Sequence, residues 1–245
     1  MSTVLVAERL DAHRAPPTDP RRRTRWLAAL LIPIGPAAVA VLRFLLPYST
    51  VDDGATIVNK VAAHPGAQSL VLWLGFLAVL TLVPGALWVG RLTRRRSPGW
   101  TAAALLLLVP GYLSLAWLIG SDLLLWGGVH AGIEAGSLTR LYEAAHPTSA
   151  VAGGLFVLGH VIGTVLLGIA MWRSRTVPRW AAVLTGLSQP LHFMAAVIVV
   201  SHPLDLVAWG MQAVGFAAAA VAVSRLRDDE WDLGPQVAAA VRSPT

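Results

Sequence analysis

The sequence predicts an all-α protein, a polytopic six-helix transmembrane bundle built as three helical hairpins. Three observations lead to this prediction: the composition, the lengths of the apolar stretches, and the distribution of the basic residues. Of the 245 residues, 56% are hydrophobic and only 13% are charged, whereas soluble domains carry about 25% charged residues. Mean hydropathy is +0.64. This much apolar surface exceeds what a soluble core can bury, so the lipid bilayer is the expected surrounding.

Six apolar stretches are each close to the roughly 20 residues that an α-helix needs to cross about 30 Å of hydrocarbon. They cover residues 26–46, 69–91, 100–122, 150–172, 180–200 and 204–225. Residues 1–25 are polar and rich in proline and arginine, which predicts a disordered basic cytoplasmic tail rather than a signal peptide. The expected organisation is therefore this tail, a transmembrane domain over 26–226, and a second cytoplasmic tail over 227–245.

The basic residues alternate between the two sides of the predicted bundle. One side holds the N-terminal tail, the C-terminal tail and two arginine-rich loops, with Arg91, Arg94, Arg95, Arg96, Arg173, Arg175 and Arg179. The opposite loops contain only Lys60 and Arg140 as basic residues. The positive-inside rule then places both termini in the cytoplasm. Because this rule accounts for the net charge of +6, no nucleic-acid partner is predicted.

The first two outer loops are long enough for short helices, expected over Ala55–Ala63 and Leu138–Ala145. Lys60 is the only lysine among 19 basic residues, and this arginine bias is typical of GC-rich bacteria. A bacterial cytoplasmic membrane is the expected location.

The three hairpins share a pattern of marker residues. Each begins with an inner tryptophan, has a proline ten residues later, and has a His-Pro pair before its return helix. The markers are Trp26, Pro36 and His64-Pro65, then Trp100, Pro110 and His146-Pro147, then Trp180, Pro190 and His202-Pro203. Proline is favoured in the first turn of a helix and is tolerated within membrane spans. The pattern indicates either a shared geometry without further meaning or prolines that shape a cavity between repeats.

His160 and His192 are the strongest candidates for a functional site. They are expected about 15 Å and about 12 Å from the outer ends of adjacent antiparallel spans, and intramembrane ionisable residues are functional candidates by default. With Ser188 and Gln189 they would form a polar ligand site. Two other interpretations stay open beside it: a bis-His haem b or another metal, and neutral histidines hydrogen-bonded to the backbone or to Thr164, Ser188 or Gln189.

Arg43 and Asp122 form a second candidate pair at the outer ends of the first and third spans. A salt bridge between them would reduce the free energy needed to bury both charges. The alternative is a polar outer vestibule with His130, in which Asp122 accepts a proton or a cation. The three His-Pro histidines could hold Zn²⁺ or Cu²⁺ if they met, although capping roles are favoured.

Gly159 and Gly163 form a G-x-x-x-G motif, which predicts close helix packing inside the protein or in a homo-oligomer. The chain has no cysteine, so thiolate chemistry is excluded, and it contains no nucleotide-binding, zinc-protease or serine-hydrolase motif. No cofactor is predicted, and a non-enzymatic role is favoured. The leading hypothesis is a small-ligand or ion binding or transport module. The alternatives are a haem b redox protein and a non-catalytic structural or assembly protein.

The loop after the fourth span reads R-S-R-T-V-P-R-W. With Arg173, Ser174, Val177, Pro178, Arg179 and Trp180, it resembles the R-S-x-x-V-P-R-W inner loop of an uncharacterised family of six-span bacterial integral membrane proteins, a domain of unknown function. The likeness is strong in the second half of the chain and rests on span count in the first. It implies a six-span fold and no particular activity.

Overall fold

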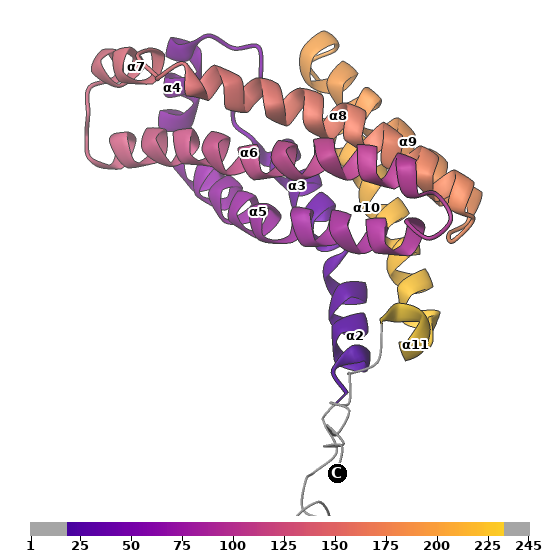
Figure 1. Ribbon diagram of the computed structural model, residues 1–245. Helices are drawn as coiled ribbons and strands as arrows, with labels where there is room; N and C mark the ends of the chain where they lie inside the picture. Colours follow the sequence, from indigo (N-terminus) through magenta and orange to yellow (C-terminus); the bar gives the residue numbers. More distant parts are fainter. Residues whose placement is uncertain (1–18, 233–245) are drawn as a thin grey trace, which may run out of the picture.

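The computed structural model of the protein describes residues 19–232, and all regular secondary structure in that range is helical (Figure 1). Six of the helical segments are long and apolar enough to cross a membrane. The all-α, six-span prediction is therefore confirmed. The spans are Arg21–Leu45, Pro65–Thr93, Pro98–His130, Thr148–Ser174, Arg179–Ile198 and His202–Arg225.

The first span consists of two helices, α2 (Arg21–Leu31) and α3 (Ile34–Leu45), with a break at Ile32 and Pro33. Proline lacks the N–H that would continue the helical hydrogen bonds, so a break here is expected. The helix begins at Arg21, so the prediction of a disordered tail over 1–25 is wrong for its last five residues. Residues 1–18 of that tail lie outside the described range.

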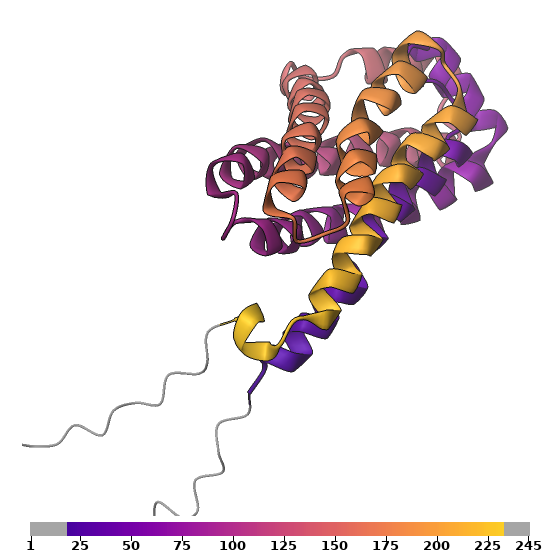
Figure 2. The same cartoon turned by 90° about the vertical axis from the view of Figure 1, so that its right-hand side faces the viewer.

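Contacts with the end of the sixth span explain this early start. Arg25 donates hydrogen bonds to the carbonyl oxygens of Ser224 and Leu226 and pairs with Asp228 at 3.1 Å. Asp228 opens α11 (Asp228–Trp231), which packs against α2. Of the predicted tail over 227–245, residues up to 232 are thus attached to the bundle, and the rest lies outside the described range. Figure 2 shows the start of the first span and the end of the last span side by side, projecting beyond the other helices.

The other spans are α5 (Pro65–Thr93), α6 (Pro98–His130), α8 (Thr148–Ser174), α9 (Arg179–Phe193) with the π-helix η1 (Met194–Ile198), and α10 (His202–Arg225). Each span packs against its neighbours in sequence, and α10 packs against α3, which closes the ring. The first and last spans therefore lie side by side, and six spans surround a common interior. The three expected hairpins are three consecutive segments of this ring.

The helix α6 extends beyond the predicted span at its outer end. Its 33 residues correspond to about 50 Å, which exceeds the roughly 30 Å hydrocarbon core. Two short helices, α4 (Gly54–Ala63) and α7 (Ala135–Glu143), pack on each other and on this end of α6, close to where the sequence predicts helices in the outer loops. Their contacts form a small separate core of Ile57, Val58, Val61, Leu125 and Leu138. We call α4 and α7 the outer cap, where inner and outer denote the two ends of the bundle as the sequence predicts them.

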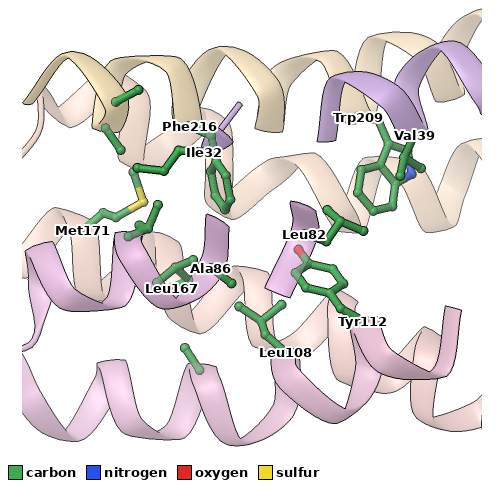
Figure 3. Packing of buried hydrophobic residues seen from close by; sticks show 14 of the residues in the cluster. Ile32, Val39, Leu82, Ala86, Leu108, Tyr112, Leu167, Met171, Trp209 and Phe216 are labelled. Atoms are coloured by element: carbon green, nitrogen blue, oxygen red, sulfur yellow. The ribbon is translucent and has the colours of Figure 1, made fainter. Parts of the chain in front are cut away.

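The main apolar core contains buried residues from all six spans, among them Ile32, Val39, Leu82, Ala86, Leu108, Tyr112, Leu167, Met171, Trp209 and Phe216 (Figure 3). The side chains drawn in this view lie between the helices. Trp209 lies at one end of the set drawn, beside Val39. Both residues also line a cavity that opens beyond this core.

The His-Pro pairs mark the starts of the return helices. Pro65 is the first residue of α5, Pro203 is the second residue of α10, and Pro147 is the N-cap of α8. These are positions where the missing proline N–H leaves no helical hydrogen bond unmade. Among the residues described, no three His, Asp or Glu side chains are grouped to hold a metal ion. The structure therefore gives no support to a metal shared by His64, His146 and His202.

Candidate functional site

The structure brings His160 and His192 together in the interior of the ring. Their ring centroids are 5.3 Å apart with an interplanar angle of 48°, and both side chains are buried. Trp209 of α10 completes a group of three rings, with its centroid 5.7 Å from His160 and 5.4 Å from His192. These residues come from α8, α9 and α10, so the group connects the last three spans.

Asp205 holds this group to the first span. Its carboxylate accepts from His192 Nδ1 and from Arg43 Nε, each at 2.5 Å, through different oxygens. The Asp205 side chain is 1% exposed and the Arg43 side chain is 15% exposed. Two partners for one buried carboxylate satisfy the rule that buried charges are paired. Asp205, His192 and Arg43 therefore form a charged cluster across the contact that closes the ring.

The expected salt bridge between Arg43 and Asp122 is replaced by this cluster. Asp205, near the start of the expected span 204–225, is not among the residues that the sequence predicts for a site, yet it lies in the first turn of α10 and faces inward. The spacing of polar and aromatic residues along the sixth span could have identified Asp205. Asp205, Trp209 and Gln212 are separated by four and three residues, which puts them on one face of a helix. All three are buried.

Asp122 has a different partner. It accepts a hydrogen bond from the phenolic oxygen of Tyr48 at 2.5 Å, and Tyr48 follows the first span in the chain. Burial raises the pKa of Tyr48 well above its ordinary value, and the neighbouring Asp122 carboxylate adds to this. The phenol therefore keeps its proton at neutral pH and remains a hydrogen-bond donor. His130, considered beside Asp122 in the sequence, instead stacks on Trp126.

Ser188 and Gln189 are buried near the histidines but do not line the cavity described below. Ser188 donates to the Thr185 carbonyl oxygen at 2.7 Å. Gln189 donates to Gln212 Oε1 at 2.5 Å, and Gln212 donates to Tyr112 Oη at 2.8 Å. Of these two predicted site residues, Gln189 therefore bonds to a neighbouring span, and Ser188 bonds to the backbone of its own helix.

A cavity of about 850 Å³ lies between the histidines and the outer cap. Four of the six predicted ligand-site residues line it: Arg43, Asp122, His160 and His192. Tyr48 and Trp209, which the sequence did not indicate, line it as well. Most other lining residues are apolar, including Leu42, Leu46, Ile57, Leu115, Phe156, Val157, Phe193 and Val197. The cavity thus combines a polar inner end with apolar walls. Many small-molecule sites have this composition.

The geometry of the two histidines does not fit a bis-His haem b. Such a haem places its two imidazoles on opposite faces of a porphyrin, so the ring must lie between them. Here the two imidazoles are in direct contact. The helices that carry them pack closely as well, since a Cβ added at Gly168 of α8 would lie 2.6 Å from the Gly186 Cα of α9. The spacing therefore leaves no slot for a macrocycle between His160 and His192.

Gly159 and Gly163 pack within the chain. A Cβ added at Gly159 would lie 2.7 Å from the Leu107 carbonyl oxygen and 2.9 Å from the Gly111 Cα. One added at Gly163 would lie 2.7 Å from Leu108 Cγ. The glycines therefore allow the backbones of α6 and α8 to approach, as small residues do in membrane helix pairs. Of the two roles expected for this motif, the glycines therefore serve close packing inside the protein.

Residues 26–226 match the protein-family model described as "Domain of unknown function (DUF4386)". This range begins in the first span and ends just after the last one. Comparison with curated proteins and with solved structures gives no match.

Proposed function

Because the chain belongs to the DUF4386 family of unknown function, we propose a function from its cavity: the protein is a small-ligand or ion binding or transport module. The site is the cavity between the histidines and the outer cap. One observation supports this proposal most directly. Two members of the charged cluster of Arg43, Asp205 and His192, namely Arg43 and His192, line a cavity of about 850 Å³.

Two physical arguments support the proposal. The cavity volume lies within the range of about 300 to 1,000 Å³ that is typical of ligand pockets, and such pockets have apolar walls with a few well-placed polar groups. In addition, burying ionisable residues within a membrane protein is unfavourable, so they tend to mark substrate or ion pathways. A bundle with a purely structural role could fill the same space with apolar side chains and avoid that desolvation.

The site can be tested on the full-length protein before its ligand is identified. Native mass spectrometry of the purified protein, with molecules of the expression host still bound, should show a non-covalent adduct of defined mass. Gly153 lines the cavity and a Cβ there meets no atom within 4 Å, so Gly153→Trp should fill the cavity and remove the adduct. Gly154 is equally open but does not line the cavity, so Gly154→Trp should retain it.

An adduct that survives Gly153→Trp as fully as Gly154→Trp would contradict the proposed site. So would a wild-type protein that carries no adduct and whose thermal stability does not change when an extract of host lipids and metabolites is added.

The proposal includes a location, the bacterial cytoplasmic membrane with both termini in the cytoplasm. The arginine-rich loops lie at the end of the bundle opposite the outer cap, and the positive-inside rule assigns that end to the cytoplasm. The absence of cysteine makes single-cysteine labelling straightforward. In intact cells, a membrane-impermeant maleimide should label Ala144→Cys, next to the outer cap, and should label Gly99→Cys only after lysis. The reverse pattern would invert the topology.

A further inference from the structure

Two polar atoms at the inner end of the cavity have no hydrogen-bond partner among the described residues. They are His160 Nε2 and Trp209 Nε1, and both are buried. Both residues line the cavity. In Figure 3 the indole nitrogen of Trp209 lies on the Val39 side of the ring, away from Leu82 and Tyr112. Buried polar atoms in native proteins are nearly always paired with protein, water or a ligand. These two atoms therefore indicate where a bound molecule makes its polar contacts.

The hydrogen bonds of His160 define what Nε2 can do. Its Nδ1 is bonded to the carbonyl oxygen of Phe156. A carbonyl oxygen only accepts, so Nδ1 carries the hydrogen. In a neutral imidazole Nε2 is then an acceptor, whereas the indole Nε1 of Trp209 is always a donor. The inner end of the cavity thus offers one acceptor and one donor. A hydroxyl group, which donates once and accepts up to twice, satisfies both.

The charges beside the inner end of the cavity are already paired. Arg43 binds Asp205 and also donates to Thr50 at 2.9 Å. Asp122 is bonded instead to the neutral phenol of Tyr48, which packs against the core of the outer cap. At the inner end a charged ligand head would therefore lack a free counter-charge, and burying an unpaired charge is strongly unfavourable. A neutral head fits the inner end better than a carboxylate or an ammonium.

On one side, the cavity is lined by apolar residues that are partly exposed. Val157 of α8, Phe193 of α9 and Val197 of η1 line the cavity, yet their side chains are 36%, 39% and 41% exposed. The helices α8 and α9 are in close contact near Gly168 and Gly186. Beyond that point α9 changes to the π-helix η1, which packs against α10. Phe193 and Val197 therefore lie where α9 changes to η1.

We propose that the cavity takes a neutral amphiphile, a molecule with one apolar chain and a hydroxyl head, which enters from the outer leaflet between α8 and η1. The hydroxyl donates to His160 Nε2 and accepts from Trp209 Nε1, while the chain lies along Val157, Phe193 and Val197. This inference rests on the proposed function, because it names the ligand class of the same site.

The first experiment uses a photoreactive analogue of hexadecanol with a diazirine on its chain, added to the full-length protein in lipid nanodiscs. Crosslinks should map to the α8 segment around Val157 and to the segment from Phe193 to Val197. Unlabelled hexadecanol should compete for labelling, whereas butanol should not, since it lacks the apolar chain. Gly153→Trp should abolish labelling, and Gly154→Trp, on the same helix but outside the cavity, should leave it unchanged.

The second experiment tests the head group with hexadecanol and its methyl ether, which accepts a hydrogen bond but cannot donate one. On the wild-type protein the alcohol should bind about three- to tenfold more tightly than the ether, the effect of one hydrogen bond. His160→Phe should weaken binding of the alcohol by a similar factor and leave the ether unchanged. Trp209→Phe should weaken both. If His160→Phe does not accumulate, the comparison of alcohol and ether on the wild-type protein still tests the same hydrogen bond.

The outcomes separate the two proposals. Equal binding of alcohol and ether, or stronger competition by palmitate than by hexadecanol, would overturn the neutral hydroxyl head. If hexadecanol neither labels nor competes, but Gly153→Trp removes a co-purified adduct of another chemistry, then the ligand class is wrong and the proposed site remains. If no adduct and no labelling occur, both fail.

Discussion

Replacing Asp205 by asparagine removes the carboxylate that connects the first, fifth and sixth spans and preserves the shape of the side chain. Asp205 accepts from Arg43 and His192 at 2.5 Å each. The substitution leaves the Arg43 guanidinium without its counter-charge in a site where its side chain is only 15% exposed. We therefore expect Asp205→Asn to destabilise the protein strongly.

The magnitude follows from the burial of the pair. Breaking a buried ion pair by removing one partner destabilises by about 3 to 5 kcal/mol, and the partial exposure of Arg43 favours the lower end. For a chain of this size, about 1 kcal/mol shifts Tm by about 2 to 4 °C. A loss of about 3 kcal/mol then corresponds to a decrease of roughly 6 to 12 °C.

The assay is thermal unfolding of the detergent-solubilised protein, followed by circular dichroism. Asp52→Asn is the matched control, because Asp52 binds Lys60 at 2.7 Å but the Lys60 side chain is 40% exposed. An exposed pair contributes about 0 to 1 kcal/mol, so this variant should lose at most about 4 °C. If Asp205→Asn loses no more than this control, the account of the charged cluster is wrong. Replacing both partners, as in Arg43→Met with Asp205→Leu, should recover much of the stability.

Three further predictions concern packing, pH and backbone strain. Gly159→Ala should lower Tm by an amount equivalent to about 1 to 3 kcal/mol, since its Cβ would meet the backbone of α6. Gly154→Ala should not lower Tm, because a Cβ at that position meets no atom within 4 Å. Acidification should loosen the outer cap, because hydrogen bonds with the Lys60 ammonium and a backbone N–H hold the pKa of Asp52 below its ordinary value of 3.8. A depressed carboxyl pKa stabilises the fold above that ordinary value, and this contribution is lost as pH falls through the folded-state pKa. Val200 has φ +55°, an outlier for a β-branched residue, so Val200→Gly should leave Tm unchanged or raise it slightly despite the entropic disadvantage of glycine.

Each of these has a specific measurement. Scanning calorimetry or circular dichroism gives Tm for the two alanine variants and for Val200→Gly; a clear decrease for Val200→Gly would show that the positive φ is not strained. For the outer cap, hydrogen-exchange protection of the α4 amides should fall as the pH is lowered below 3.8, the ordinary carboxyl pKa, after correction for intrinsic exchange. Asp52→Asn should flatten this dependence, and an unchanged pH profile in that variant would contradict the role of Asp52.

The sequence alone determined the six spans, because a membrane span is a local property. A stretch of about 20 apolar residues must satisfy its own backbone hydrogen bonds in lipid, and only a helix does so within one segment. The return-helix starts at the His-Pro pairs follow from the same local chemistry, since proline fits the first turn of a helix wherever the chain needs one. The contact between His160 and His192 could also be predicted, because adjacent spans with a short connection pack antiparallel.

The partner of Arg43 was decided only by the tertiary structure. Asp122 and Asp205 both lie toward the outer end of the bundle, and the sequence gives no reason to choose the one 162 residues away. The ring closes by packing α3 against α10 on one side and α5 on the other, which brings Asp205 to Arg43 and leaves Asp122 on α6 to be held by Tyr48. The cavity arises in the same way, because it depends on where packed helices diverge. Local patterns of hydrophobicity and charge fix each helix, whereas the neighbours of each helix follow from the simultaneous packing of all six.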